Sequence, residues 1–238
     1  MKPKLWLLDM DDTLYSASAG MFHDIHVLMD AYIVEKLGVS AEQANELRKY
    51  YWRKYGVTYY GLWLHHGIDP HDFLTATHKV DTSSIHTQGR MREAITSLRG
   101  QRILFTNAPD SFADQVLERL NLTNCFVDQY RAENMKVFGH WRPKPSAKML
   151  KKVLAYHHVK PHECCLVDDN LNNLKVAKTV GIQTVLCKGW HHHGLEVIRP
   201  IPYVDAFISH IRDIEKILVS PTPKKQKHRR PVFLNPYN

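Results

Sequence analysis

The chain has 238 residues, of which 44% are hydrophobic and 24% are charged, and its formal net charge is +8. This composition is that of a soluble globular protein able to bury a core, either as one domain or as a core domain with a smaller insert. No run of eighteen apolar residues occurs, which excludes a membrane-spanning helix. The four apolar residues before Asp9 are too few for a signal peptide, and the four cysteines lack CxxC spacing, so we expect a cytoplasmic protein.

The positive charge is concentrated at the C-terminus. Residues 221–238 contain no acidic residue and five cations, which are Lys224, Lys225, Lys227, Arg229 and Arg230. Removing these five from the total of +8 leaves +3 on the rest of the chain. We therefore interpret residues 220–238 as a poorly ordered basic tail, and the nearly balanced body argues against a nucleic-acid partner.

The first predicted element is a buried strand at 5–8, which ends in the acidic sequence Asp9-Met10-Asp11-Asp12-Thr13. From about residue 20 to 80 the pattern is helical. Apolar residues recur at steps of three and four between 21 and 37, and Gly38 ends that helix. Ser40 and Gln43 form a capping box for the next helix. No strand-like alternation interrupts this region, which predicts an all-helical insert.

After Gly89 the predicted strands and helices alternate. Strands are expected at 102–106, 126–130, 164–167, 184–186 and 206–208, and helices near 90–99, from 111, at 146–156 and at 171–180. Such alternation predicts a mostly parallel, Rossmann-like α/β sheet that is covered by helices on both faces.

Polar side chains follow several of these apolar runs. They are Asp9 and Asp11, then Thr106 and Asn107, then Lys144, then Asp168 and Asp169. The carboxyl ends of parallel strands share one edge of a sheet, so we expect these groups to meet in one crevice.

The chemistry of these groups indicates phosphoryl transfer. Clustered carboxylates need a cation, and oxygen ligands without His or Cys favour Mg²⁺. Lys144 and Thr106 could hold phosphate oxygens. A carboxylate nucleophile such as Asp9 would form an aspartyl-phosphate, and Asp11 could protonate the leaving oxygen and later activate water.

With these motifs in order, residues 5–190 resemble the haloacid dehalogenase-like (HAD) hydrolase superfamily. The resemblance implies that Asp9 is the nucleophile and Asp11 the acid/base. It implies that Mg²⁺ is held by Asp9, the main-chain carbonyl of Asp11, Asp168 and Asp169. Phosphate binding falls on Thr106, with the adjacent Asn107, and on Lys144.

A narrower resemblance is to the pyrimidine 5′-nucleotidase group. It rests on three stretches, which are residues 12–15, 55–62 and 67–73. It implies UMP and CMP as substrates, although Tyr60 and the adjacent bulk of Trp63 depart from that group's pattern. We expect Tyr55, Thr58 and Tyr60 to contact the substrate from a lid.

The predicted organisation is a catalytic core of residues 1–14 and 86–219 with a helical cap of residues 15–85. The partner would be a small phosphate monoester. Open alternatives are a phosphatase of a sugar phosphate or pyridoxal phosphate, a phosphomutase, a dehalogenase, and a nucleic-acid-binding protein on an inactive hydrolase scaffold.

Overall fold

The computed structural model describes residues 2–87, 89–189 and 200–219. The predicted basic tail lies outside these residues. The described chain contains a six-stranded, fully parallel sheet in the order β3-β2-β1-β6-β7-β8. The strands are β1 (Leu5–Leu8), β2 (Gln101–Phe105), β3 (Asp128–Tyr130), β6 (Cys164–Asp168), β7 (Gln183–Cys187) and β8 (Ala206–Ile208). The predicted α/β class is confirmed.

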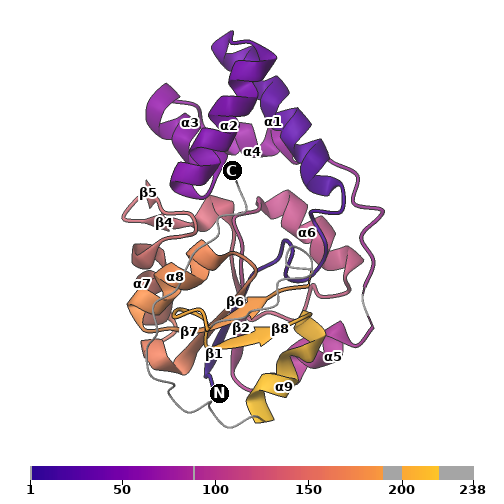
Figure 1. Ribbon diagram of the computed structural model, residues 1–238, viewed down its shortest axis with the longest axis vertical. Helices are drawn as coiled ribbons and strands as arrows, with labels where there is room; N and C mark the ends of the chain where they lie inside the picture. The colour runs from indigo at the N-terminus through magenta and orange to yellow at the C-terminus, as the bar shows by residue number, and fades with distance from the viewer. Residues whose placement is uncertain (1, 88, 190–199, 220–238) are drawn as a thin grey trace.

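Strand β1 is buried on both faces at the centre of this sheet. Its side chains alternate: Leu5 and Leu7 join an apolar cluster on one face, and Trp6 and Leu8 join the cluster on the other. The first face is covered by α7 (Ala147–Tyr156) and α8 (Leu171–Val180). The second is covered by α5 (Met91–Thr96), α6 (Asp110–Arg119) and α9 (Ile214–Val219) (Figure 1). Short 3₁₀ turns η1 (Ala132–Asn134), η2 (Pro161–Glu163) and η3 (Ile211–Asp213) complete this part.

Helices occupy the described chain between β1 and α5, in agreement with the predicted all-helical insert. They are α1 (Met21–Leu37), α2 (Ala41–Tyr55), α3 (Thr58–His66) and α4 (Pro70–Thr77), and they form a group above the sheet in Figure 1. Gly38 ends α1 in a left-handed conformation, and the Ser40–Gln43 capping box begins α2. None of the helices in the described part of the chain combines the length and apolar character that a membrane span requires.

A small antiparallel hairpin was not predicted. It consists of β4 (Lys136–Val137) and β5 (His140–Trp141) and lies between α3 and α7 in Figure 1. Each strand has two residues, too few for the sequence to show a period of two. Trp141 nevertheless has an architectural role, because it packs edge-on against Tyr59 of α3 with ring centroids 6.0 Å apart.

Candidate active site

Three carboxylates meet at the carboxyl ends of β1 and β6, which are neighbours in the sheet. Asp9 directly follows β1, Asp168 is the last residue of β6, and Asp169 comes next. One oxygen of each of Asp9, Asp168 and Asp169 lies within 4.8 Å of the others. The structure therefore brings these three predicted site residues together at one edge of the sheet.

Lys144 lies among these acids and is almost completely buried. Its Nζ donates to Oδ1 of Asp9 at 2.6 Å and to Oδ2 of Asp168 at 3.0 Å. Burial acts to lower the pKa of Lys144, but the carboxylates of Asp168 and Asp9 outweigh it and raise this pKa above its ordinary value. The ammonium therefore stays charged within the cluster.

Asn107 fixes the backbone that carries Lys144. The backbone N–H of Lys144 donates to Oδ1 of Asn107 at 2.8 Å, and Nδ2 of Asn107 donates to the Lys144 carbonyl at 3.0 Å. The sequence assigned Asn107 to phosphate binding, and the structure gives its side chain this positioning contact. The neighbouring Thr106 is fully buried at the end of β2, and its Oγ1 accepts from the backbone N–H of Ala108 at 3.1 Å.

The carboxylate of Asp168 is also held from its other side. Nδ2 of Asn173 donates to Oδ1 at 2.9 Å and to Oδ2 at 3.0 Å, and the Asn170 N–H donates to Oδ1 at 2.9 Å. Asn173 lies on α8 and is buried. Sequence reasoning missed it, although an asparagine on the apolar face of the helix after the acidic pair was a usable signal.

Asp11 lies two residues beyond Asp9, outside the carboxylate cluster. Its Oδ1 accepts a hydrogen bond from the hydroxyl of Tyr15 at 2.5 Å. Burial raises the pKa of Asp11 to about 6, and the Tyr15 hydrogen bond opposes this rise. A carboxyl with a pKa near neutrality can both give and take a proton under physiological conditions.

The turn around Asp11 is held by a second acid. Asp12 has a φ of +53°, and its Oδ1 accepts from both the backbone N–H and the hydroxyl of Ser18, at 3.0 and 2.9 Å. These bonds join residues 12 and 18 across the loop that leads to α1. The sequence did not predict the bond from Tyr15 to Asp11 or the bonds from Ser18 to Asp12.

The electrostatics of the cluster indicate a cation site. Burial and the nearby Asp168 raise the pKa of Asp9 to about 7, against the lowering effect of Lys144. The pKa of Asp169 is raised for the same two reasons, burial and Asp168. With all three carboxylates ionised, the single ammonium would leave two uncompensated negative charges. A divalent cation with a preference for oxygen ligands fits both that charge and that donor set.

The predicted lid residues have different environments. The Tyr60 hydroxyl accepts from Nη1 of Arg142 at 3.4 Å, so it reaches the segment that carries Lys144. The Tyr55 hydroxyl bonds with Nε2 of His65 at 2.6 Å. Thr58 is buried, and its hydroxyl donates to the Arg48 carbonyl at 3.3 Å, within the helical group.

The helical group and the lysine loop touch directly at Gly56, between α2 and α3. A Cβ at Gly56 would lie 2.6 Å from Cδ of Pro145 and 2.7 Å from the Lys144 carbonyl oxygen. The backbone of the predicted lid therefore packs against the backbone that presents the site's lysine.

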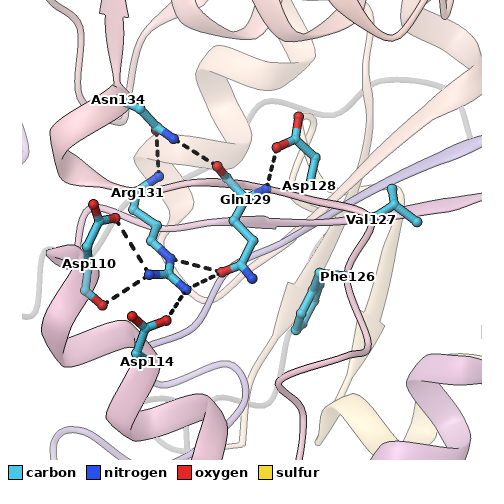
Figure 2. Close-up of a pocket in the computed structure, with 8 residues that line it drawn as sticks. All are labelled: Asp110, Asp114, Phe126, Val127, Asp128, Gln129, Arg131 and Asn134. Carbon is cyan, nitrogen blue, oxygen red and sulfur yellow. Dashed lines mark hydrogen bonds and ion pairs between the residues drawn. The ribbon is translucent and has the colours of Figure 1, made fainter.

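A separate polar hollow lies near the N-terminal end of α6 (Figure 2). Its central guanidinium, that of Arg131, pairs with the side chains of Gln129 and Asp114 and with the Asp110 carbonyl. None of the residues predicted for the catalytic site lines this hollow. Because its arginine is bonded to its own walls, we assign the chemistry to the carboxylate cluster instead.

Comparison with protein families identifies a family whose model matches most of the chain. The model of the haloacid dehalogenase-like hydrolases matches residues 3–181. Among curated proteins, a phosphoglycolate phosphatase from Vibrio vulnificus (strain CMCP6) is 27% identical over 118 residues, which are 49% of each chain. Another from Vibrio parahaemolyticus serotype O3:K6 is 30% identical over 91 residues, 38% of each chain. The similarity thus spans at most about half the length of these curated relatives.

Solved structures share the fold over nearly the whole chain. A HAD phosphatase from Thermococcus onnurineus superposes with a TM-score of 0.57 at 18% identity, covering 93% of this chain and all of that one. A 2-haloacid dehalogenase from Pseudomonas syringae pv. Tomato DC3000 gives 0.56 at 20% identity, covering 91% and 98%. At these identities the likeness shows the fold alone.

Proposed function

This chain belongs to the haloacid dehalogenase-like hydrolase family, and from that membership we propose that it is a Mg²⁺-dependent phosphatase of small phosphate monoesters. The observation that supports this best is the buried Lys144 ammonium between the carboxylates of Asp9 and Asp168, with a second acid, Asp11, two residues from Asp9. Together these residues would supply a carboxylate nucleophile, a fixed cation for phosphate oxygens and a proton donor.

The reaction would proceed in two steps. A carboxylate oxygen of Asp9 attacks phosphorus, the ester P–O bond breaks, and the leaving oxygen takes a proton from Asp11. Water then attacks phosphorus of the aspartyl-phosphate and gives its proton to Asp11, and the bond between phosphorus and Asp9 breaks. Inorganic phosphate leaves, and both acids return to their starting states.

Charge neutralisation falls to Lys144 and to the proposed cation. The Lys144 ammonium balances part of the charge that the phosphoryl oxygens bring into the buried cluster. Asp9, Asp168, Asp169 and the main-chain carbonyl of Asp11 would hold Mg²⁺, which when bound polarises the phosphoryl group as a Lewis acid. Asn107 and Asn173 keep Lys144 and Asp168 in position.

A dehalogenase is the second candidate, because solved dehalogenases share this fold. That chemistry also uses the first aspartate as a nucleophile, but it needs neither Mg²⁺ nor an acid two residues later. The carboxyl of Asp11, with a pKa raised to about 6, favours the phosphatase.

For the leaving group, we propose a pyrimidine nucleoside, as in UMP and CMP, on the resemblance of residues 55–62 and 67–73 to the pyrimidine 5′-nucleotidases. The curated relatives are named for phosphoglycolate, so that ester is the direct competitor. Residues 15–85 would act as the cap that closes over the phosphate and excludes water, with Tyr55, Thr58 and Tyr60 as its selecting residues.

The test is phosphate release from UMP, CMP, AMP, GMP, phosphoglycolate, a sugar phosphate and pyridoxal phosphate, with and without Mg²⁺. Asp9→Asn is the inactive reference, and Asp81→Asn, at an exposed acid, is the matched control. Mg²⁺-dependent release that Asp9→Asn abolishes and Asp81→Asn retains is the expected result. Preference for UMP and CMP supports the nucleotide assignment, and preference for phosphoglycolate replaces it. Chloride release from a 2-chloro acid without phosphate release would instead establish a dehalogenase.

A further inference from the structure

Tyr15 connects the proposed acid/base to the first helix of the chain. Its hydroxyl is 2.5 Å from Oδ1 of Asp11 and 3.7 Å from Sδ of Met21, the first residue of α1. A hydroxyl has one hydrogen, and the short contact to the carboxyl is the one that takes it. The ring is only 3% exposed, so this bond is shielded from water.

The surroundings hold Tyr15 in one place. The backbones of Asp11 and Tyr15 form a β-bridge, and the Leu14 N–H donates to the Met10 carbonyl at 2.8 Å. The Tyr15 ring packs in the apolar cluster that also contains Met21. The phenol therefore cannot rotate away without opening the core, and it acts as a fixed donor.

A fixed donor at Oδ1 orients the whole carboxyl group of Asp11. The two oxygens then differ: Oδ1 accepts the Tyr15 hydrogen, and Oδ2 is the oxygen left to exchange a proton with the leaving group or with water. In the part of the chain that the structure describes, no hydrogen bond to Oδ2 is formed. Such preorganisation is what a proton donor requires, because proton transfer depends on the donor's alignment with the leaving oxygen.

We propose that Tyr15 is a positioning residue that aligns Asp11 for protonation of the leaving group. This inference rests on the proposed phosphatase function. The alignment by Tyr15 matters most in the first step, because there the proton of Asp11 must reach an ester oxygen whose position is fixed by the bound substrate.

The test uses the leaving group as the probe. An alkoxide leaves slowly without a proton, whereas p-nitrophenolate is a stable anion that leaves without one. In Tyr15→Phe, the first-turnover rate of leaving-group release from UMP, or from whichever alkyl ester the wild type hydrolyses, should fall on the order of tenfold. Release from p-nitrophenyl phosphate should fall less than about twofold, and KM for both should stay unchanged.

The chain offers a matched control. Tyr32 also donates its hydroxyl to a carboxylate, Oδ2 of Asp72 at 2.6 Å, but within the helical group. Tyr32→Phe therefore removes the same kind of bond and should leave both rates unchanged. Asp11→Asn is the positive reference, and it should show the same selectivity for the alkyl ester with a larger loss.

Equal loss on both esters, or no loss on either, in Tyr15→Phe would overturn the inference while the wild type remains an active phosphatase. Failure of the wild type to hydrolyse either ester with Mg²⁺ is a different result: it would reject the proposed function and the inference with it. Melting temperatures of the variants confirm that each is folded before rates are compared.

Discussion

The side-chain amide of Asn107 pairs with both backbone polar groups of Lys144, 37 positions further along the chain. Asn107 follows β2, and Lys144 precedes α7, so the bond pair joins two loops at the same edge of the sheet. Lys144 is therefore held through its backbone by Asn107 and through its Nζ by the carboxylates of Asp9 and Asp168.

Replacing Asn107 with alanine should lower kcat/KM on the order of tenfold, because Lys144 loses the two bonds that fix its backbone. It should also lower the free energy of unfolding by about 1–3 kcal/mol, since two polar backbone groups lose their partner. Asn134→Ala is the matched control, because Asn134 likewise bonds two backbone groups, those of Arg131 and Gln129, away from the site. Urea unfolding and steady-state kinetics measure both effects. Equal loss of activity in the two variants would contradict a specific role for Asn107.

Gly56→Ala should reduce activity by more than its loss of stability can explain. Gly56 and Gly38 both have positive φ, +83° and +65°, so alanine at either costs about 1 kcal/mol of backbone strain. Only at Gly56 does the new Cβ meet other atoms, those of Pro145 and Lys144, whereas Gly38 has nothing within 4 Å. We expect both variants to lose stability, and only Gly56→Ala to lose several-fold in kcat/KM. Normal activity in a folded Gly56→Ala would show that this contact can shift without consequence.

Mg²⁺ should stabilise the folded chain even without substrate. At ten times its dissociation constant, a ligand that binds only the folded state adds about 1.4 kcal/mol to the free energy of unfolding. For a chain of this size that corresponds to a rise in Tm of roughly 3–6 °C. Asp169→Asn removes one of the three carboxylates and should abolish most of the shift, while Asp81→Asn should keep it. Differential scanning calorimetry with and without EDTA measures the shift, and an unchanged Tm in wild type would count against the site.

His78 should make stability depend on pH. It ends α4, its Nδ1 lies 3.1 Å from the Leu74 carbonyl, and its ring meets Phe112 of α6 edge-on. Burial lowers its pKa from 6.5 to about 4. Between these values the unfolded chain binds more protons than the folded one, so stability is lost as the pH falls through 6.5.

Lowering the pH from 7 to 5 should reduce the free energy of unfolding by about 1–2 kcal/mol through this histidine, allowing for its partial exposure. In urea unfolding over the same pH interval, the free energy of unfolding of His78→Gln should therefore fall by less than that of wild type, and the difference should equal this amount. His71→Gln, at an exposed histidine in the same helix, should behave like wild type. An identical pH dependence in His78→Gln would show that the imidazole charges freely in the folded state.

The sequence predicted the elements whose signal is local. Strands β1, β6 and β7 are apolar runs followed by a turn or a helix, and α1 ends at the glycine that its periodicity indicated. The grouping of Asp9 and Asp168 also followed, because β1 and β6 are parallel neighbours that end at a common edge.

The sequence did not predict the hydrogen-bond partners of the individual side chains. Tyr15 was read only as part of a family motif, Asn107 as a phosphate ligand, and Asn173 not at all. Periodicity reports which face of an element is buried, but partners are set by the packing of elements far apart in the chain. The β4–β5 hairpin escaped for a simpler reason, since two-residue strands carry no periodic signal.

Trp141 makes the packing of the four helices depend on a residue that lies far from them in the chain. The residue lies beyond β2 and β3 in the chain, yet together with Ala132 it completes the apolar cluster formed by α1–α4. The four helices are therefore not a self-contained module. A fragment ending at residue 85 would leave Tyr59 without its aromatic neighbour, and a chimera that exchanges these helices would also have to carry the hairpin. Packing therefore ties the four helices to a hairpin that lies between β3 and β6 in the chain.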